Sequence, residues 1–250
     1  MEVFFTFSFF MIGAVFGSFF NVVGLRVPKK IPFTTGRSYC PHCHKQLRFY
    51  ELIPIVSFIM QKGKCRSCQA RISFIYPFVE LLTGILFAFS FSKIGFAPEL
   101  VVALLFVSLL MIIFVSDMAY MIIPDKVLLF FLPLFVTLRI FVPLEPWYDA
   151  LIGAAVGYIL IALIIIFSNG GMGGGDMKLF GVIGFVLGWK YVLLAFFLAA
   201  LFGAVVGGMF MLLKKVERKE PIPFGPFIVF GALISYFYGE KIIDIYLSLL

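Results

Sequence analysis

Long apolar runs recur along this chain and restrict the folds open to it. A helix needs roughly 20 apolar residues to cross about 30 Å of hydrocarbon. A shorter run at 178–189 follows a glycine-rich loop, and we count it as a crossing, although a tilted or re-entrant segment would also fit. The other runs lie at 3–24, 75–91, 98–116, 127–143, 150–167, 191–213 and 225–239. We therefore expect an all-α polytopic membrane protein with about eight transmembrane segments.

The composition excludes a soluble globular protein. Hydrophobic residues make up 62% of the 250 residues, charged residues 13%, and the mean hydropathy is +1.11. That is more apolar surface than one core of this size buries. The first 30 residues start with an acid and place their basic residues after the apolar run, unlike a cleaved secretory signal. The first segment is therefore expected to remain as an anchor.

The basic residues are distributed unequally between alternate loops. Ten of the 20 Lys and Arg lie between Arg26 and Arg71, four lie between Lys214 and Lys219, and Lys126 and Lys178 fall in loops of the same parity. The other four are assigned to the opposite face: Lys93, Arg139, Lys190 and Lys241. The positive-inside rule then makes the first face cytoplasmic and places the N-terminus outside. The net charge of +7 thus reports topology, and we expect no nucleic-acid partner.

All four cysteines lie in the loop of about 50 residues after the first segment, as "YCPHCHK" and "KCRSCQ". Two C-x-x-C knuckles in a reducing cytoplasm are typical of a structural Zn²⁺ bound by four thiolates, with redox chemistry or unligated thiols as alternatives. His42 and His44 are expected beside the site rather than on the metal. The predicted ligands are Cys40, Cys43, Cys65 and Cys68. A module this small has little core, so the metal would contribute folding energy.

Two aspartates lie near the cytoplasmic edge on either side of the sequence "MAYMIIP". Asp125 follows a proline and precedes an apolar helix, which is typical of an N-cap. Asp117 comes at the C-terminal end of an apolar segment, where the helix dipole disfavours an anion. Helix stability does not require a carboxylate there. Asp117 is therefore a functional candidate.

A third aspartate, Asp176, follows the glycine-rich stretch "SNGGMGGG" and begins the next helix. It could serve as an N-cap alone. Glycine also tolerates positive φ and lets another backbone approach closely, as a peptide substrate would. Two aspartates from different loops can share a proton and activate water, as in an aspartic protease. We therefore predict that Asp117 and Asp176 form such a pair.

Several longer motifs resemble, in order, those of the type IV prepilin peptidases, which are intramembrane aspartic proteases with a glycine-x-glycine-aspartate signature. The motifs are "GSFFNVVGLRVP", the two knuckles, "YELIPIVSFIMQKGKCRSC", "YPFVELLTG", "SDMAYMIIPD", "GMGGGDMKL" and "IPFGPF". They cover nearly the whole chain. One departure is Phe20, where the family pattern leads us to expect leucine.

The resemblance implies a bacterial cytoplasmic-membrane enzyme that cuts the basic leader from prepilins or pseudopilins at the cytoplasmic face. Such enzymes commonly then methylate the new N-terminal amine with S-adenosyl-L-methionine, and the knuckles match the bifunctional form. By motif, Asp117 and Asp176 are the catalytic pair. The active-site loop comprises Gly173, Gly174, Gly175 and Lys178. Supporting or methyl-transfer roles fall to Glu51, Glu80 and Asp125.

The predicted division is a first transmembrane segment at 1–24, a cytoplasmic zinc-binding loop module at 25–74 and a transmembrane protease core at 75–250. Two other classes of protein remain open. An ion-coupled transporter would need its carboxylates near mid-membrane. A membrane-anchored zinc-binding adaptor would leave the glycines unexplained. The sequence does not indicate which prepilin is served or the oligomeric state.

Overall fold

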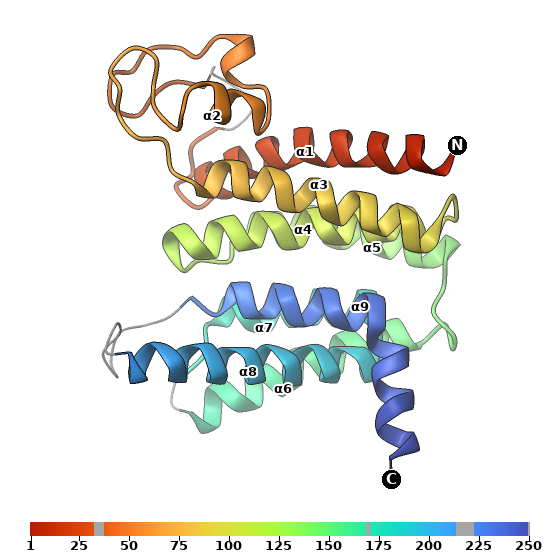
Figure 1. Ribbon diagram of the computed structural model, residues 1–250. Coiled ribbons are helices and arrows are strands. Elements are labelled where there is room, and N and C mark those ends of the chain that lie inside the picture. The colour runs from red at the N-terminus through yellow and green to blue at the C-terminus, as the bar shows by residue number, and fades with distance from the viewer. Residues whose placement is uncertain (33–37, 169–170, 214–222, 250) are drawn as a thin grey trace. The chain divides into compact units, whose positions relative to one another are not determined.

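The computed structural model describes residues 1–32, 38–168, 171–213 and 223–249 (Figure 1). These residues form α-helices and one 3₁₀ helix and no strand, only two isolated bridges, Tyr39 with Gln46 and Lys64 with Arg71. The elements are α1 (Glu2–Arg26), η1 (Phe49–Glu51), α2 (Val56–Met60), α3 (Ile75–Ile94), α4 (Glu99–Tyr120), α5 (Asp125–Phe141), α6 (Asp149–Phe167), α7 (Gly174–Leu187), α8 (Trp189–Leu212) and α9 (Gly225–Ser248). The all-α prediction is confirmed.

Every predicted apolar segment lies largely within one helix. Six of these helices are long and apolar enough to cross a bilayer: α1, α3, α4, α6, α8 and α9. The helices α5 and α7 have 17 and 14 residues, so they span only about 26 and 21 Å at 1.5 Å per residue. The chain is thus a multi-pass membrane protein, and eight full crossings remain a prediction.

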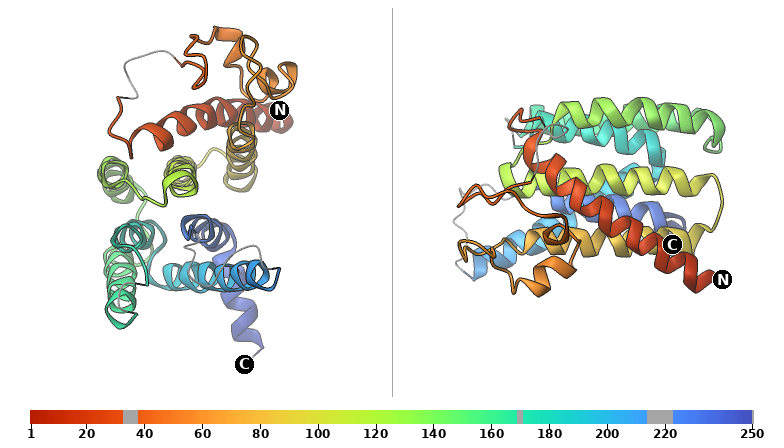
Figure 2. Two further views of the ribbon diagram at one scale, coloured as in Figure 1. Left: turned by 90° about the vertical axis from the view of Figure 1, so that its left-hand side faces the viewer. Right: turned by 90° about the horizontal axis from the view of Figure 1, so that it is seen from above.

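The chain forms two compact units, 1–115 and 116–250, which divide within α4. In the first unit α1 and α3 pack so closely that a side chain on Gly13 or Gly17 would meet α3, at Thr83 and Glu80 among others. Small residues at such contacts let membrane helices approach each other. The loop module lies at the Arg26 end of α1, where α3 begins (Figures 1 and 2). The predicted division into a first segment at 1–24, a loop module at 25–74 and a protease core at 75–250 remains a prediction.

In the second unit, the short helix α7 is held within protein. Gly184 of α7 packs against Gly153 of α6, and most α7 side chains after its first turn are buried. At the far end of α7, the buried Arg139 of α5 donates a hydrogen bond of 2.6 Å from Nη2 to the carbonyl of Val186. A helix that is surrounded by protein does not need the length of a lipid-exposed span.

Candidate active site and metal centre

Asp117 lies in the last turn of α4 and is 5% exposed. Its Oδ2 accepts a hydrogen bond of 2.7 Å from the backbone N–H of Gly225, the first residue of α9. The sequence predicted the unfavourable helix C-terminus but not this partner. The N-terminus of α9 supplies both a donor and a favourable dipole, which offset the effect of the α4 end. The acid is therefore held in a defined position by a second helix.

Asp176 lies at the third position of α7, not at its N-cap, which is Gly173. Its Oδ2 accepts the N–H of Gly173 at 2.9 Å, the acidic half of a capping box. The suggestion that Asp176 is the N-cap is therefore wrong by three residues. The carboxylate still stabilises the helix start, so a structural role and a chemical role coexist at this residue.

The described loop glycines serve close approach rather than unusual backbone angles. Neither Gly171 nor Gly173, Gly174 or Gly175 has positive φ, so that expectation is wrong for them, while Gly170 lies outside the described residues. A Cβ on Gly175 would lie 3.0 Å from the Cβ of Ile123. Gly174, by contrast, has no such neighbour within 4 Å. One glycine thus brings the loop against the turn after α4, and another leaves an open surface.

The two candidate acids are close enough to interact electrostatically. They come from helix ends 59 positions apart in the sequence, and each carboxylate accepts a backbone N–H at a helix N-terminus. A fixed N–H leaves the remaining lone pairs of each carboxylate for water or a shared proton. A coupled acid pair with one shared proton remains a prediction.

The sequence suggested that Asp125 is the N-cap of a helix, but the structure shows that it is not. Pro124 is the N-cap of α5, and Asp125 is the first helical residue with no side-chain capping bond. Its Oδ2 instead pairs with Nζ of Lys178 at 2.8 Å, and both side chains are exposed. At the first helical position a carboxylate still benefits from the helix dipole, which explains an acid there without a cap. Lys178, which comes two residues after Asp176, is thereby held on the exposed side of α7.

The four cysteines come together in the loop module. Their Sγ atoms all lie within 4.8 Å of one another, with 3.8 Å between Cys40 and Cys68 and 4.0 Å between Cys43 and Cys65. A tetrahedron with Zn–S of about 2.3 Å has S···S of about 3.8 Å, so the cluster fits the ion. The backbone N–H groups of Cys68 and Ser67 lower the pKa of the Cys65 thiol to about 6. The four thiols are therefore positioned to bind a metal ion, and His42 and His44 do not belong to the cluster. Binding of zinc stays a prediction.

Glu51 and Glu80 hold the backbone of the loop module. Glu51 Oε2 accepts the N–H of Arg48 at 2.8 Å and closes η1, so its partner is a backbone group and not a basic side chain. The buried Glu80 of α3 accepts the N–H of Ile55 at 2.7 Å. Ile55 has φ of +63°, which is strained for a β-branched residue. Glu80 thus ties this backbone position to α3.

Gly225 and Arg139 have contacts that the sequence did not reveal. Gly225 lies in the quoted motif "IPFGPF", but its contact with Asp117 joins positions 108 residues apart. Arg139 was counted only among the charges of the outer face, yet it is 7% exposed and donates to helix-end carbonyls. An arginine inside an apolar run was the available signal, since such a residue needs partners.

These features define a polytopic membrane protein with two aspartates that each accept a backbone N–H at a helix N-terminus, and with a cluster of four cysteines positioned to bind a metal ion. Comparison with known proteins gives the family. The chain belongs to the type IV leader peptidase family: residues 104–208 match that family, and residues 11–94 match the bacterial peptidase A24 N-terminal domain.

Three relatives align with the chain along more than nine tenths of their length. The chain is 45% identical over 240 residues to a prepilin leader peptidase/N-methyltransferase of Bacillus subtilis, which covers 96% of this chain and 97% of that one. It is 31% identical to the protein of the same name from Stutzerimonas stutzeri, over 95% and 92% of the two chains. It is 33% identical to the protein of that name from Aeromonas salmonicida, over 96% of this chain and 92% of the relative. No solved structure matches the chain.

Proposed function

We propose that this protein removes the leader peptide from type IV prepilins or pseudopilins and methylates the N-terminal amine that the cut exposes. The names of the relatives support both activities. The observation that carries the cleavage is the placement of Asp117 and Asp176, each held by a backbone N–H at a helix start and each within electrostatic reach of the other.

In the proposed cleavage the pair carries one proton. The ionised carboxylate removes a proton from a water whose oxygen attacks the scissile carbonyl carbon, and the protonated carboxyl gives its proton to the carbonyl oxygen. The tetrahedral intermediate then transfers a proton to the amide nitrogen, and the C–N bond breaks. One acid and one amine leave, and the pair again holds a single proton. The hydrogen bonds from Gly225 and Gly173 keep the two acids oriented throughout.

The open position at Gly174 suits an extended substrate backbone beside Asp176. Gly174 is exposed, and a Cβ there would meet nothing within 4 Å. A substrate strand can approach a glycine backbone more closely than a backbone that carries side chains. The salt bridge between Lys178 and Asp125 lies next along the same helix start. The loop thus supports the proposal by leaving room for a peptide against the acid pair.

In the proposal, zinc occupies the four-cysteine cluster as a structural ion. The ligand set of Cys40, Cys43, Cys65 and Cys68 would leave no open coordination position for water or substrate. The bound ion would supply folding energy to a module whose described hydrogen bonds are mostly short turns. Zinc has no role in the cleavage step.

S-adenosyl-L-methionine would supply an electrophilic methyl group to the new amine. Its sulfonium is positively charged, and Glu51 and Glu80 are carboxylates of the first unit that suit such a charge. Each already accepts one backbone N–H and, as a carboxylate, has further lone pairs to offer. The fit is limited to this charge match, and we assign no other residue to the donor.

We place the enzyme in the bacterial cytoplasmic membrane with the N-terminus outside and the acid pair at the cytoplasmic face. The distribution of Lys and Arg supports this orientation. Ten basic residues between Arg26 and Arg71 are the largest group on the face that we assign to the cytoplasm. The four between Lys214 and Lys219 lie outside the described residues.

One assay tests the function and separates it from its rivals. Purified protein in nanodiscs is incubated with a peptide that joins a basic leader to a pilin-like apolar helix, and the products are identified by mass. We expect a single cut at the leader boundary, abolished by Asp117→Asn. An intact peptide would instead favour the transporter or the zinc-binding adaptor. Ion flux into proteoliposomes that depends on the same aspartates would then identify a transporter.

A further inference from the structure

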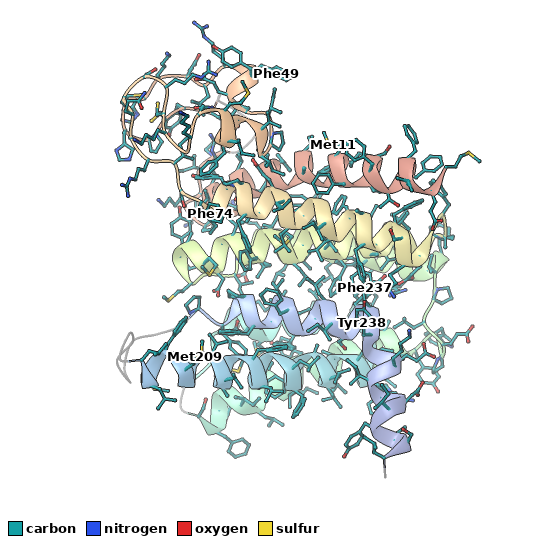
Figure 3. All side chains as sticks on the ribbon, in the orientation of Figure 1. Met11, Phe49, Phe74, Met209, Phe237 and Tyr238 are labelled. Carbon is teal, nitrogen blue, oxygen red and sulfur yellow. The ribbon has the colours of Figure 1, made fainter. Side chains whose placement is uncertain are left out.

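The loop module exposes a group of large apolar side chains on η1 and α2. Phe49 is 85% exposed, Ile59 67% and Met60 66%, and Leu52 and Val56 are also exposed. Soluble surfaces rarely leave so many large apolar residues together in water. Figure 3 labels Phe49 at the outer part of the module. We call Phe49, Leu52, Val56, Ile59 and Met60 the apolar face of the module.

On α2, the apolar face is the side of the helix that does not pack within the module. Val56, Ile59 and Met60 have helical i, i+3 and i+4 spacing and therefore share one face. Phe58 points elsewhere: a Cβ on Gly63 would lie 3.1 Å from its ring, and its ring packs edge-on against Phe74 at 6.1 Å. The inner side of α2 is thus packed within the module, and the outer side is left for an external surface.

The module that carries this face is rich in exposed cations. Eight exposed basic residues belong to the described part of the module: Lys29, Lys30, Lys45, Arg48, Lys62, Lys64, Arg66 and Arg71. Glu51 is the only acid in the same stretch of sequence. Apolar and aromatic residues bordered by Lys and Arg are typical of segments that lie in the interface of an anionic bilayer. The charge therefore complements phospholipid headgroups.

We propose that the apolar face docks on the surface of the bilayer that contains this protein, with its cations on anionic lipid headgroups. The module lies between the Arg26 end of α1 and the start of α3, two membrane-spanning helices (Figure 1). This tether keeps the face at a high effective concentration next to the membrane, so even weak contacts keep it docked. A basic leader peptide has the wrong charge for this border, which is why lipid rather than substrate is the occupant.

Tryptophan fluorescence tests the proposal on the full-length chain. Trp147 and Trp189 are first replaced by Phe, and Phe49→Trp then provides the single probe. Tyr39→Trp, at an exposed position beside the first knuckle, is the matched control. Each protein is reconstituted in nanodiscs of phosphatidylcholine with or without phosphatidylglycerol. The lipids carry brominated acyl chains, and acrylamide is the aqueous quencher.

We expect brominated lipid to quench the probe at 49 and acrylamide to quench the control at 39. Replacing Lys62 and Lys64 with Gln should lower lipid quenching at 49 by about twofold in discs with phosphatidylglycerol, and little in discs without it. Equal acrylamide access at both positions would overturn the proposal. So would protection of position 49 that arises only when leader peptide is added, because the face would then belong to the substrate.

A second measurement protects the test against misfolding of the probe variants. Hydrogen exchange of residues 49–60 in the unaltered chain should slow in discs that contain phosphatidylglycerol, and unchanged exchange would contradict docking. Zinc content equal to that of the unaltered chain shows that the module is folded. None of these readouts depends on cleavage, so failure of the proposed peptidase activity leaves the docking result interpretable.

Discussion

The Asp117 carboxylate accepts a 2.7 Å hydrogen bond from the backbone N–H of Gly225. A side chain at position 225 has no room, because its Cβ would lie 2.6 Å from Oδ2 of Asp117 and 2.7 Å from its Cβ and Cγ. The N–H of Gly225 holds the carboxylate in place, and only glycine leaves room for this close contact. The glycine of "IPFGPF" is thereby part of the active site that we propose.

Gly225→Ala should inactivate the peptidase while the protein remains folded. The added methyl must push Asp117 away, and displacement of a catalytic group by about 1 Å costs on the order of 100-fold in rate. Gly208→Ala in α8 is the control, since a Cβ there meets nothing within 4 Å. Initial cleavage rates of both variants decide the matter, and equal rates would show that the contact is dispensable.

Asp117→Asn and Asp176→Asn should each abolish cleavage, because neither variant can form a pair with one shared proton. Both amides are nearly isosteric with the acids, and the Asn carbonyl can still accept the N–H of Gly225 or Gly173. Thermal unfolding should therefore change little. Residual cleavage above about 1% of the native rate in either variant would argue against an acid pair.

Asp125→Asn should keep most of the activity. The structure changes the reason for this expectation, because Asp125 does not cap α5 but forms an exposed salt bridge with Lys178. Exposed pairs contribute about 0–1 kcal/mol, so losing one changes stability little. Cleavage kinetics of the variant are the measurement. An inactive Asp125→Asn beside an active Asp117→Asn would mean that the catalytic pair is misassigned.

Chelators should act on folding and not directly on the peptide cut. The proposed chemistry needs no ion, whereas the module with Cys40, Cys43, Cys65 and Cys68 would lose its folding energy without one. Cleavage should therefore survive brief exposure to chelator and decline as zinc is released. Zinc content and activity are followed together over time. Immediate inhibition with the zinc still bound would reveal a catalytic metal.

Glu51→Gln separates the two activities. The glutamine carbonyl can still accept the N–H of Arg48, so η1 should persist and only the charge is lost. We expect cleavage to continue and methyl transfer to fall, measured with labelled S-adenosyl-L-methionine. Preserved methylation would leave Glu51 a purely structural residue. Loss of cleavage alone would contradict the division of labour between the module and the aspartates.

The sequence predicted the helices and the metal cluster well because both follow from local rules. Hydrocarbon demands long apolar helices, and tetrahedral thiolate sites demand closely spaced cysteines. The contacts that complete the acid site are not local. Asp117 meets Gly225 across 108 positions, and Asp125 meets Lys178 across 53. A single sequence has no pattern that pairs such positions, so the true partners of these acids emerged only from the structure.

The shortness of α7 limits how a substrate can enter. Gly188 and then Trp189 and Lys190 follow α7, and because Trp and Lys are typical of a membrane interface, we expect the end of α7 near one bilayer surface. A helix of 14 residues starting there ends about 9 Å short of the other side of a 30 Å core. We then expect Asp176 to lie below the level at which a full-length span would end. Unwinding a helix lengthens it by about 1.8 Å per residue, from about 1.5 to about 3.3 Å, so we expect a prepilin to unwind roughly five residues to bring the scissile bond to the acids.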